Sequence, residues 1–582
     1  MKVFWLSLLF ILSFCFTGRS DLHGQSHMEG EGFHPPVNIP LRLSGNFGEL
    51  RSNHFHAGID IKTRGTTGQK TFAIAGGYVS RIKVSSGGYG RAIYIHHPHK
   101  GLTSVYGHLK QFSPAIEAYV TDRQYEKKSF EIQLFPKKDQ FPVERGSLIG
   151  WSGNSGSSEG PHVHFEIRNL SDQEPLNPLR YDFDIRDNIP PKIFNLAVYP
   201  LGKNASVNGT HQKQIFRVIE KTQDRYALGS HRKISLHGKV GFGLRAFDFL
   251  NGAPNWCGLY TVKLFVDSTL MYHHQMDRFA FHQTRYINSL IDYEEKIKNE
   301  RSFQQSFRKP NNPLPIYEYL RNKGIYHFSG NTRHTVTYQI ADVYGNTSRL
   351  SFTVESLPQK TPGIKTHHDP QGKCMPFNQS NSFVKEDIRL NFPKNAFYDT
   401  LYFQYHKDTA ITGSNDSGAI YSAIHQVHNR YTPVHKSYNL SIQTKDLPEI
   451  LENKAFIARI DPEDDSYRYM GGEPVNGFIS TQVRSFGKFA VMVDQQKPHI
   501  EPLVINQEKI SFKIDDELSG IDRYNGYLNG RWVLFEYDPK NDKLTYHVDH
   551  QRLKKADRYN LELYISDAVG NMATYHDTLQ FE

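Results

Sequence analysis

The stretch Gly160-Pro161-His162-Val163-His164-Phe165-Glu166-Ile167 decides how this chain is interpreted. As a β-strand it would place His162, His164 and Glu166 on one face, because successive side chains of a strand point to opposite faces. The apolar residues between them would then face a core. Two imidazoles on one face can converge on a metal ion and on a water molecule beside it.

Chance alone explains part of this pattern. Among 29 histidines in 582 residues, roughly one or two His-x-His pairs are expected at random. The chain contains three such pairs, at residues 54 and 56, 97 and 99, and 162 and 164. The motif therefore needs partners elsewhere in the chain.

Partners for a metal site lie upstream. A catalytic zinc ion takes three His, Asp or Glu ligands and leaves a fourth position for water. His56 and Asp60 stand in a His-x-x-x-Asp arrangement, and Gly58 between them allows a bend. With His164 they make a set of two histidines and one carboxylate, while His108 ends a further expected strand.

The ordered set of these motifs resembles the lysostaphin-type (LytM-like) zinc endopeptidases of bacterial cell walls, over residues 43–177. The resemblance implies an antiparallel β-sheet peptidase domain at residues 35–187. It implies Zn²⁺ as cofactor, with His56, Asp60 and His164 as its ligands. It also implies that His162 is the general base, with His108 beside it to hold the water or to steady the developing oxyanion.

Other polar residues of this domain keep two interpretations. Glu166 either orients a metal ligand or is a carboxylate with a structural partner. His54 is a less favoured alternative ligand, because its spacing to Asp60 does not fit the pattern. The His54-Phe55 pair and a long insertion at residues 110–142 depart from the family pattern. The insertion is interpreted as a lid, a latency element or a substrate loop that could carry a short helix.

Beyond residue 187 the chain is expected to form three β-sandwich domains, so the predicted fold class is all-β. The segments are the first sandwich (188–356, with a helical insert near 287–308), the middle segment (357–494) and the C-terminal sandwich (495–582). An Asp-x-x-Gly-Asn turn before a final strand occurs at Asp342 and at Asp567. The first and last segments thereby resemble bacterial immunoglobulin-like sandwiches, and their alternating strands support this.

Residues 1–20 have the pattern of a secretory signal peptide, with an anchored helix as the alternative. Export to the periplasm or cell envelope of a bacterium is therefore expected, with no transmembrane segment after signal removal. Cys15 raises lipoprotein anchoring as a minority interpretation, since bulky Phe14 precedes it. Cys257 and Cys374 would remain, and the sequence leaves their pairing open.

The net charge of +9 is mild for this length. It suits an anionic polymer such as a cell wall better than nucleic acid, which usually requires a dense basic stripe. Peptidoglycan is the expected partner, and the sequence does not specify an oligomeric state. Three functions remain: an endopeptidase for peptidoglycan cross-links, an exported zinc protease acting on proteins, and a non-catalytic wall-binding or activating relative.

Overall fold

The computed structural model describes residues 32–229, 233–358, 372–408, 414–415, 418–553 and 556–580. Strands build nearly all of it, which confirms the all-β fold class. The expected signal peptide and Cys15 lie outside the described residues. Within these ranges, no helix has both the length and the apolar character needed to cross a membrane.

The N-terminal domain is an antiparallel sheet whose centre carries the decisive stretch. Its strands are β1 (Leu43–Gly45), β2 (Leu50–Arg51), β3 (His54–Phe55), β4 (Ile59–Lys62), β5 (Lys70–Phe72), β6 (Gly77–Val84), β7 (Arg91–His97), β8 (Leu102–Phe112), β9 (Ile132–Leu134), β10 (Pro142–Val143), β11 (Leu148–Ser152), β12 (His162–Asn169) and β13 (Pro175–Leu176). The main order is β1-β4-β12-β8-β7-β6-β10, and β2 and β3 form a separate hairpin.

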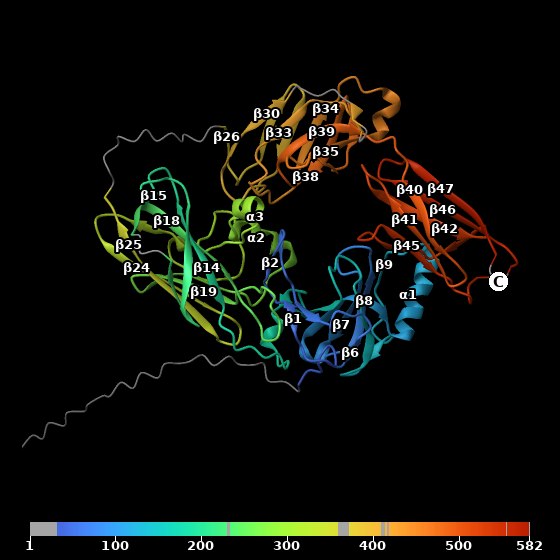
Figure 1. Ribbon diagram of the computed structural model, residues 1–582, viewed down its shortest axis with the longest axis horizontal. Helices are drawn as coiled ribbons and strands as arrows, with labels where there is room; N and C mark the ends of the chain where they lie inside the picture. The colour runs from blue at the N-terminus through green and yellow to red at the C-terminus, as the bar shows by residue number, and fades with distance from the viewer. Residues whose placement is uncertain are drawn as a thin grey trace, which may run out of the picture.

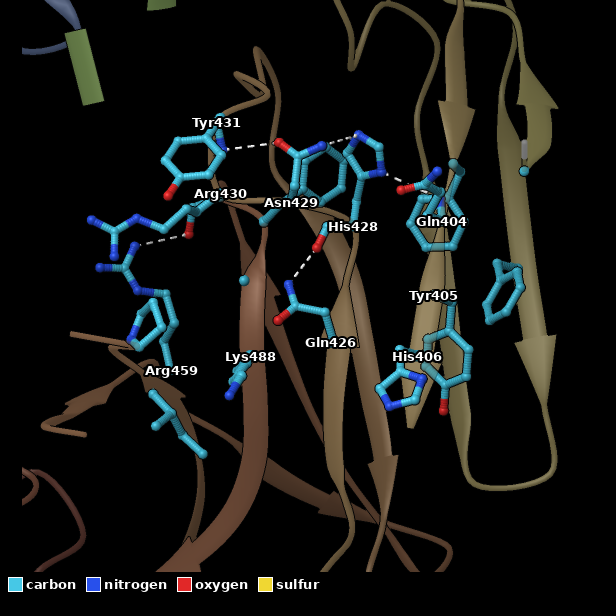
Figure 2. A pocket seen from close by; sticks show the side chains of 18 of the residues that line it. Gln404, Tyr405, His406, Gln426, His428, Asn429, Arg430, Tyr431, Arg459 and Lys488 are labelled. Carbon is cyan, nitrogen blue, oxygen red and sulfur yellow. Dashed lines mark hydrogen bonds between the residues drawn. The ribbon is translucent and has the colours of Figure 1, made fainter. Parts of the chain in front are cut away.

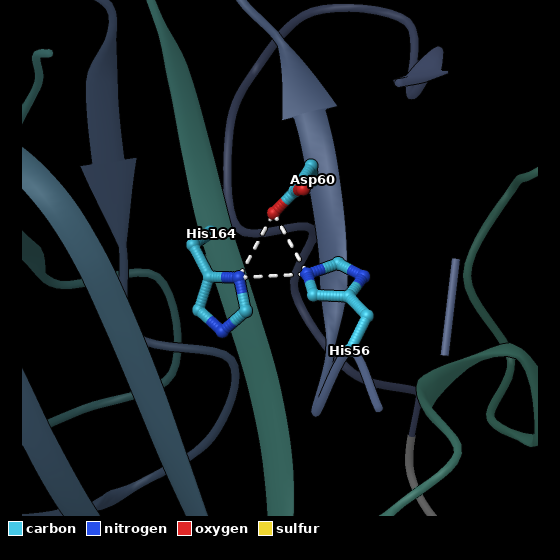
Figure 3. A group of neighbouring side chains, drawn as sticks. All are labelled: His56, Asp60 and His164. Carbon is cyan, nitrogen blue, oxygen red and sulfur yellow. Dashed lines mark hydrogen bonds and ion pairs between the residues drawn. The ribbon is translucent and has the colours of Figure 1, made fainter. Parts of the chain in front are cut away.

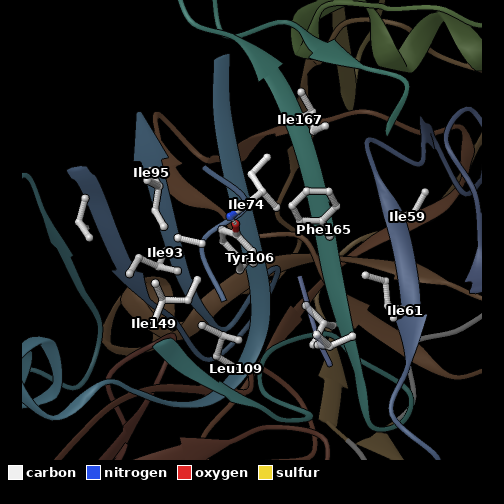
Figure 4. Packing of buried hydrophobic residues seen from close by; sticks show 14 of the residues in the cluster. Ile59, Ile61, Ile74, Ile93, Ile95, Tyr106, Leu109, Ile149, Phe165 and Ile167 are labelled. Atoms are coloured by element: carbon white, nitrogen blue, oxygen red, sulfur yellow. Dashed lines mark hydrogen bonds between the residues drawn. The ribbon is translucent and has the colours of Figure 1, made fainter. Parts of the chain in front are cut away.

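Strand β12 lies between β4 and β8, and this position assembles the site. His164 is opposite Asp60 on β4 and opposite Gly107 on β8. Its apolar neighbours Val163 and Phe165 are fully buried in the core on the other face (Figure 4). The alternation predicted for this stretch is therefore present.

The polar face of β12 is nearly as buried as the apolar face. His164 is 3% exposed and Glu166 is 0% exposed. The sequence did not predict this burial, because the residues that cover the polar face of β12 are distant in sequence. The Tyr89 ring stacks on His164, and the Phe281 ring of the first sandwich lies over the Arg168 guanidinium.

The insertion at residues 110–142 is a structured part of the domain. It contains helix α1 (Pro114–Lys127), and its later part adds β9 and β10 to the edge of β6. Ile116 and Val120 bury their side chains in the domain core. The exposed side of α1 contacts the C-terminal sandwich, where the Tyr125 ring meets the edge of Trp532.

The first sandwich closes around a main apolar core, with smaller buried clusters beside it. Its strands are β14 (Lys192–Pro200), β15 (Ser206–Val207), β16 (Gln214–Thr222), β17 (Arg225–Leu228), β18 (Ile234–Phe247), β19 (Thr261–Val266), β20 (Thr269–Gln275), β21 (Gln304–Gln305), β22 (Tyr317–Leu320), β23 (Tyr326–Phe328), β24 (Arg333–Ala341) and β25 (Thr347–Ser356). The expected helical insert is two short helices, α2 (Ile287–Leu290) and α3 (Tyr293–Asn299), followed by strand β21.

The middle segment and the C-terminal sandwich have cores of their own. The middle strands are β26 (Lys373–Met375), β27 (Asn381–Lys385), β28 (Ile388–Phe392), β29 (Leu401–Phe403), β30 (Tyr405–Asp408), β31 (Ser414–Asn415), β32 (Gly418–Ile420), β33 (Ile424–Val427), β34 (Tyr438–Gln443), β35 (Ala455–Ile460), β36 (Tyr467–Tyr469), β37 (Glu473–Val475), β38 (Phe478–Val483) and β39 (Gly487–Val493). The C-terminal strands are β40 (His499–Ile505), β41 (Lys509–Asp515), β42 (Ile521–Leu528), β43 (Arg531–Val533), β44 (Glu536–Asp538), β45 (Lys543–His547), β46 (Tyr559–Asp567) and β47 (Met572–Leu579), in two four-stranded sheets.

The four parts of the chain follow one another around a closed path (Figure 1). The C-terminal sandwich returns to the N-terminal domain, where Arg91 pairs with Glu536 at 2.8 Å. Lys540 Nζ also donates to the carbonyl oxygens of Asn154 and Ser158, at 2.6 and 3.0 Å. The last domain therefore contacts the loop that leads into β12.

The two described cysteines are not paired. Cys257 is buried and Cys374 is exposed, and both are free thiols. The pairing that the sequence left open is not formed.

Candidate metal centre

Three side chains from two neighbouring strands and one turn meet at a single point (Figure 3). Asp60 Oδ1 lies 3.0 Å from His56 Nε2 and 2.8 Å from His164 Nδ1. The two imidazole nitrogens are 3.0 Å apart. The ligand set predicted from the sequence is thus brought together, and all three residues are buried.

Gly58 makes this convergence possible. A Cβ at position 58 would lie 2.2 Å from the carbonyl oxygen of Phe165 on β12, which is far inside van der Waals contact. Only glycine lets the turn between His56 and Asp60 approach β12 this closely.

Hydrogen bonds fix the imidazole tautomers. His56 Nδ1 donates to the carbonyl oxygen of Asn46 at 2.8 Å, so its Nε2 presents a lone pair to the centre. His164 Nε2 donates to Glu166 Oε1 at 2.9 Å, so its Nδ1 presents the other lone pair. These contacts are typical of metal-bound histidines, whose second nitrogen is normally held by a carboxylate or carbonyl.

Glu166 contacts His164, as the first of its two interpretations requires, and it also has structural partners, as the second requires. It also accepts hydrogen bonds from Arg168 Nε at 2.5 Å and from the Tyr89 hydroxyl. Burial opposes its ionisation, yet Arg168 and His164 lower the pKa of Glu166 to about 2. Against the same burial, Asp60 and Glu166 raise the pKa of His164 to about 9, so near pH 7 the lone pair of Nδ1 holds a proton that a metal ion would have to displace.

The second oxygen of Asp60 is also occupied. Arg51 Nη2 donates to Asp60 Oδ2 at 2.5 Å, and Arg51 Nε pairs with Glu49 at 3.3 Å. Burial opposes ionisation of Asp60, but His56 and hydrogen bonds from the neighbouring imidazoles hold the pKa of Asp60 well below its usual range. Asp60 is therefore a carboxylate, and its Oδ1 faces the centre.

His162 and His108 lie beside the three ligands. His162 Nε2 is 3.5 Å from Asp60 Oδ1, while its Nδ1 donates to the carbonyl oxygen of Gly160 at 2.8 Å. The ring centroids of His108 and His162 are 4.7 Å apart. The structure thus brings all five predicted site residues together.

His108 has an uncommon backbone conformation. Its φ of 58° lies in the left-handed region, which is uncommon for a residue with a side chain and is often found at functional sites. His108 Nδ1 donates to the carbonyl oxygen of Ser155 at 2.8 Å. Burial and the nearby imidazoles lower the pKa of His108 to about 3, so the ring is neutral near pH 7.

The donor set fits a zinc ion. Two imidazole lone pairs and one carboxylate oxygen converge within 3.0 Å, and a proton can satisfy only one of these contacts at a time. Two histidines and one carboxylate form a well-known set for a catalytic zinc with an open fourth position. His54 is not part of this set, because it is exposed and its Nδ1 bonds the carbonyl oxygen of Ser52.

Sequence reasoning missed three supporting residues. Arg51, Tyr89 and Arg168 contact the ligands or Glu166, but no spacing rule connects them to the motifs. The only signal was Tyr89 as the one large side chain in the turn Gly87-Gly88-Tyr89-Gly90.

A separate cavity of about 990 Å³ lies where the middle segment meets helix α3 (Figure 2). Aromatic and basic side chains line it, among them Tyr405, Tyr431, Arg430, Arg459 and Lys488. Arg430 is neutralised by Asp461 and Glu463, both at 3.1 Å. Among the described residues, none of the groups that could hold a metal ion lines this cavity, and it is chemically distinct from the His56 site.

Two segments of the chain match known protein families. Residues 54–125 match the sequence profile of peptidase family M23, and residues 372–494 match that of the Zu5-like domain. The second match makes the middle segment, whose type the sequence had left undefined, similar to a Zu5-like domain.

Two groups of individual proteins are similar to the N-terminal domain. "DD-carboxypeptidase/endopeptidase Mpg" of Neisseria meningitidis is 30% identical over 164 residues, which are 27% of this chain and 31% of that protein. An "uncharacterized metalloprotease" of Haemophilus influenzae is 28% identical over 162 residues, which are 27% of this chain and 28% of that protein. The chain thus spans about a third of the length of the curated relatives it matches.

Among solved structures, the catalytic domain of the prophage-encoded M23 protein EnpA from Enterococcus faecalis is 27% identical with a TM-score of 0.19. The match covers 26% of this chain and 98% of that domain. The catalytic domain of lysostaphin from Staphylococcus simulans is 21% identical with a TM-score of 0.18, over 24% of this chain and 90% of that domain.

Proposed function

We propose that the N-terminal domain, which is similar to peptidase family M23, is a zinc-dependent endopeptidase that hydrolyses peptide cross-links of bacterial peptidoglycan. One observation carries the proposal. His56 Nε2, Asp60 Oδ1 and His164 Nδ1 converge within 3.0 Å, and each of these side chains is fixed from behind by a further hydrogen bond.

In this proposal, His56, Asp60 and His164 hold Zn²⁺. When bound, the ion lowers the pKa of a water molecule towards neutrality and polarises the scissile carbonyl. The protein supplies the shape of the site, since the buried partners of each ligand prevent it from turning away.

His162 is assigned the general base. Its Nδ1–H is committed to the carbonyl oxygen of Gly160, so Nε2 is the nitrogen that faces the centre, 3.5 Å from Asp60 Oδ1. A neutral imidazole at this place can accept a proton from the attacking water near pH 7.

His108 is assigned to stabilise the oxyanion or to hold the water. Its Nδ1–H is likewise committed, to the carbonyl oxygen of Ser155, so its Nε2 is free to contact the water or the reacting group. The hydrogen bond to Ser155 positions this ring beside His162, with the ring centroids 4.7 Å apart. Such a preorganised group needs no rearrangement during the reaction.

The substrate assignment is supported by the relatives. The similar Neisseria protein is described as a carboxypeptidase and endopeptidase, and the leader sequence of this chain indicates export to the periplasm or envelope. A peptide cross-link of the cell wall is the substrate class that both observations favour.

The test is to incubate the purified, zinc-loaded protein with cross-linked muropeptides and to measure new amine ends. We expect cleavage that a chelator stops, that His164→Ala abolishes and that His54→Ala leaves unchanged. Cleavage that is indifferent to chelator, or cleavage of protein substrates alone, would contradict the proposal. The second result would assign the domain to proteases that act on proteins.

A further inference from the structure

A second group of carboxylates lies outside the His56 site, at the end of the first sandwich that meets the N-terminal domain. Asp187 precedes β14, Asp248 directly follows β18 and Asp342 directly follows β24. One carboxylate oxygen of each lies within 4.8 Å of the others. The topology of the sandwich therefore brings three acids from distant parts of the chain to one point.

Two of these acids have a buried oxygen without the partner that buried carboxylates normally have. Asp248 is only 2% exposed, yet its Oδ1 has no hydrogen-bond partner. Asp187 Oδ2 is also buried without a partner. Among the described residues, no lysine or arginine pairs with any of the three acids.

The remaining oxygens are held in place by neighbouring groups. Ile189 N donates to Asp187 Oδ1 at 3.1 Å. Asn346 donates to both oxygens of Asp342, from its backbone nitrogen at 2.9 Å and its side chain at 2.6 Å. The Asn346 side chain also donates to the carbonyl oxygen of Asp187 at 3.2 Å, which ties two of the acids together.

Leaving three such groups charged without compensation is costly. Removing a carboxylate from water is unfavourable unless it is paired, and like charges nearby add to the cost. Burial, opposed by the bond from Ile189, raises the pKa of Asp187 to about 7, and burial with the neighbouring acids raises that of Asp248 well above its usual range. The group must therefore take up either protons or a cation.

The C-terminal sandwich provides an internal comparison. Asp494, Asp516 and Asp567 occupy the matching places before β40, after β41 and at the end of β46, and they also converge. In this C-terminal group, neighbouring residues of the protein donate hydrogen bonds to the carboxylates. Three successive backbone nitrogens, those of residues 518–520, donate to Asp516 Oδ1, and the Ser519 hydroxyl donates to Asp494 Oδ2 at 2.6 Å.

We propose that Asp187, Asp248 and Asp342 bind a divalent cation of the calcium class. The ligands are all oxygen, which hard cations prefer and which does not suit zinc in competition with the His56 site. Asp248 Oδ1 and Asp187 Oδ2 supply ligand atoms that the protein leaves unsatisfied. The C-terminal group differs because its own loop satisfies the carboxylates.

The three acids lie at the joint between the first sandwich and the N-terminal domain. Leu250 and Val343, which follow the acids in the chain, are buried in the core of the N-terminal domain. Asp187 itself ends the segment that leaves that domain. A bound cation would therefore fix the joint between the first sandwich and the domain that carries the zinc-type site.

The test uses the full-length, zinc-loaded protein and Ca²⁺ as the probe. The protein is treated with a calcium-selective chelator, titrated with Ca²⁺ in a calorimeter, and melted with and without Ca²⁺. Binding to the folded state at 100 times the dissociation constant should raise the melting temperature of the first sandwich by about 5 °C or more. Asp248→Asn and Asp342→Asn should lose the heat of this site and the temperature shift.

The control is Asp184→Asn, which makes the same charge change at a side chain that is 89% exposed. It should retain both signals. Circular dichroism at 25 °C establishes that the variants are folded, and the wild-type titration does not depend on any variant. Absence of Ca²⁺ binding by the wild type, or a shift that persists in both Asn variants, would overturn the proposal.

Discussion

Replacing Glu166 with Gln separates the orienting role of this residue from a purely structural one. Glu166 accepts the Nε2–H of His164 at 2.9 Å and the Nε–H of Arg168 at 2.5 Å, and it is fully buried. Gln is nearly the same size, so the change removes charge rather than volume. We expect both zinc affinity and stability to fall, for different reasons.

The two magnitudes follow from the two contacts. Loss of a charged partner behind a metal-bound histidine typically weakens metal binding 10- to 100-fold, or about 1.4–2.7 kcal/mol. In the variant, Arg168 no longer has a carboxylate partner, although its side chain is only 8% exposed. Breaking one partner of a buried pair costs about 3 kcal/mol of folding stability or more.

A second variant distinguishes the two effects. Glu166→Gln combined with Arg168→Met removes the stranded positive charge, so most of the lost stability should return. Zinc affinity should stay low, because His164 still lacks its anionic partner. Glu144→Gln, on an exposed position, is the control for a general change in charge.

The assays are competition for zinc against a chromogenic chelator and thermal unfolding of the zinc-free protein. The reasoning would be refuted by a Glu166→Gln variant whose zinc dissociation constant equals that of the wild type. It would also be refuted if the double variant recovered affinity together with stability, since Glu166 would then act on the fold alone.

Further predictions concern other parts of the chain. His108→Ala should lower kcat for muropeptide cleavage by about 10²-fold or more, because the preorganised oxyanion contact is lost. Metal analysis should show an unchanged zinc content. A kcat equal to that of the wild type would contradict this role. Gly58→Ala should abolish zinc binding in a titration, because its Cβ would clash with β12, and normal binding would show that the turn can relax. Burial lowers the pKa of His274 to about 3. Below pH 6.5 the unfolded chain therefore binds a proton on His274 that the folded chain does not bind, and the stability of the folded state falls as the pH falls. Urea unfolding between pH 6 and 4.5 should show this loss at about 1.4 kcal/mol per pH unit, with a shallower slope for His274→Gln. Glu536→Gln should weaken the contact between the C-terminal sandwich and the N-terminal domain by about 1 kcal/mol, because Arg91 loses its ionic partner. X-ray scattering should then show a larger radius of gyration. An unchanged radius would mean that other contacts hold the two domains together.

Local spacing was enough to predict the ligands. A strand alternates its faces and a glycine permits a bend, so His56, Asp60 and His164 could be placed from neighbouring residues alone. Their buried partners could not be predicted in this way. Arg51 reaches Asp60 from a separate hairpin and Tyr89 reaches Glu166 from a turn, and these contacts depend on the tertiary packing of the domain.

The insertion shows a similar limit. Its charged and aromatic composition was compatible with a lid, but composition does not reveal which face is buried. The structure places Ile116 and Val120 in the core of the domain and gives the opposite side of α1 to the C-terminal sandwich. That partner lies some four hundred residues away in sequence, with Arg552 pairing with Asp122, so no local pattern could indicate it.

The return of the last sandwich to the first domain makes their contact intramolecular. A tethered partner experiences an effective concentration on the order of millimolar, so even an interface that two free fragments would form only weakly is closed most of the time. Arg91, Lys540 and Arg552 thus need not supply a high intrinsic affinity. Cutting the chain between these two domains, with every contact residue intact, should be enough to separate them on dilution.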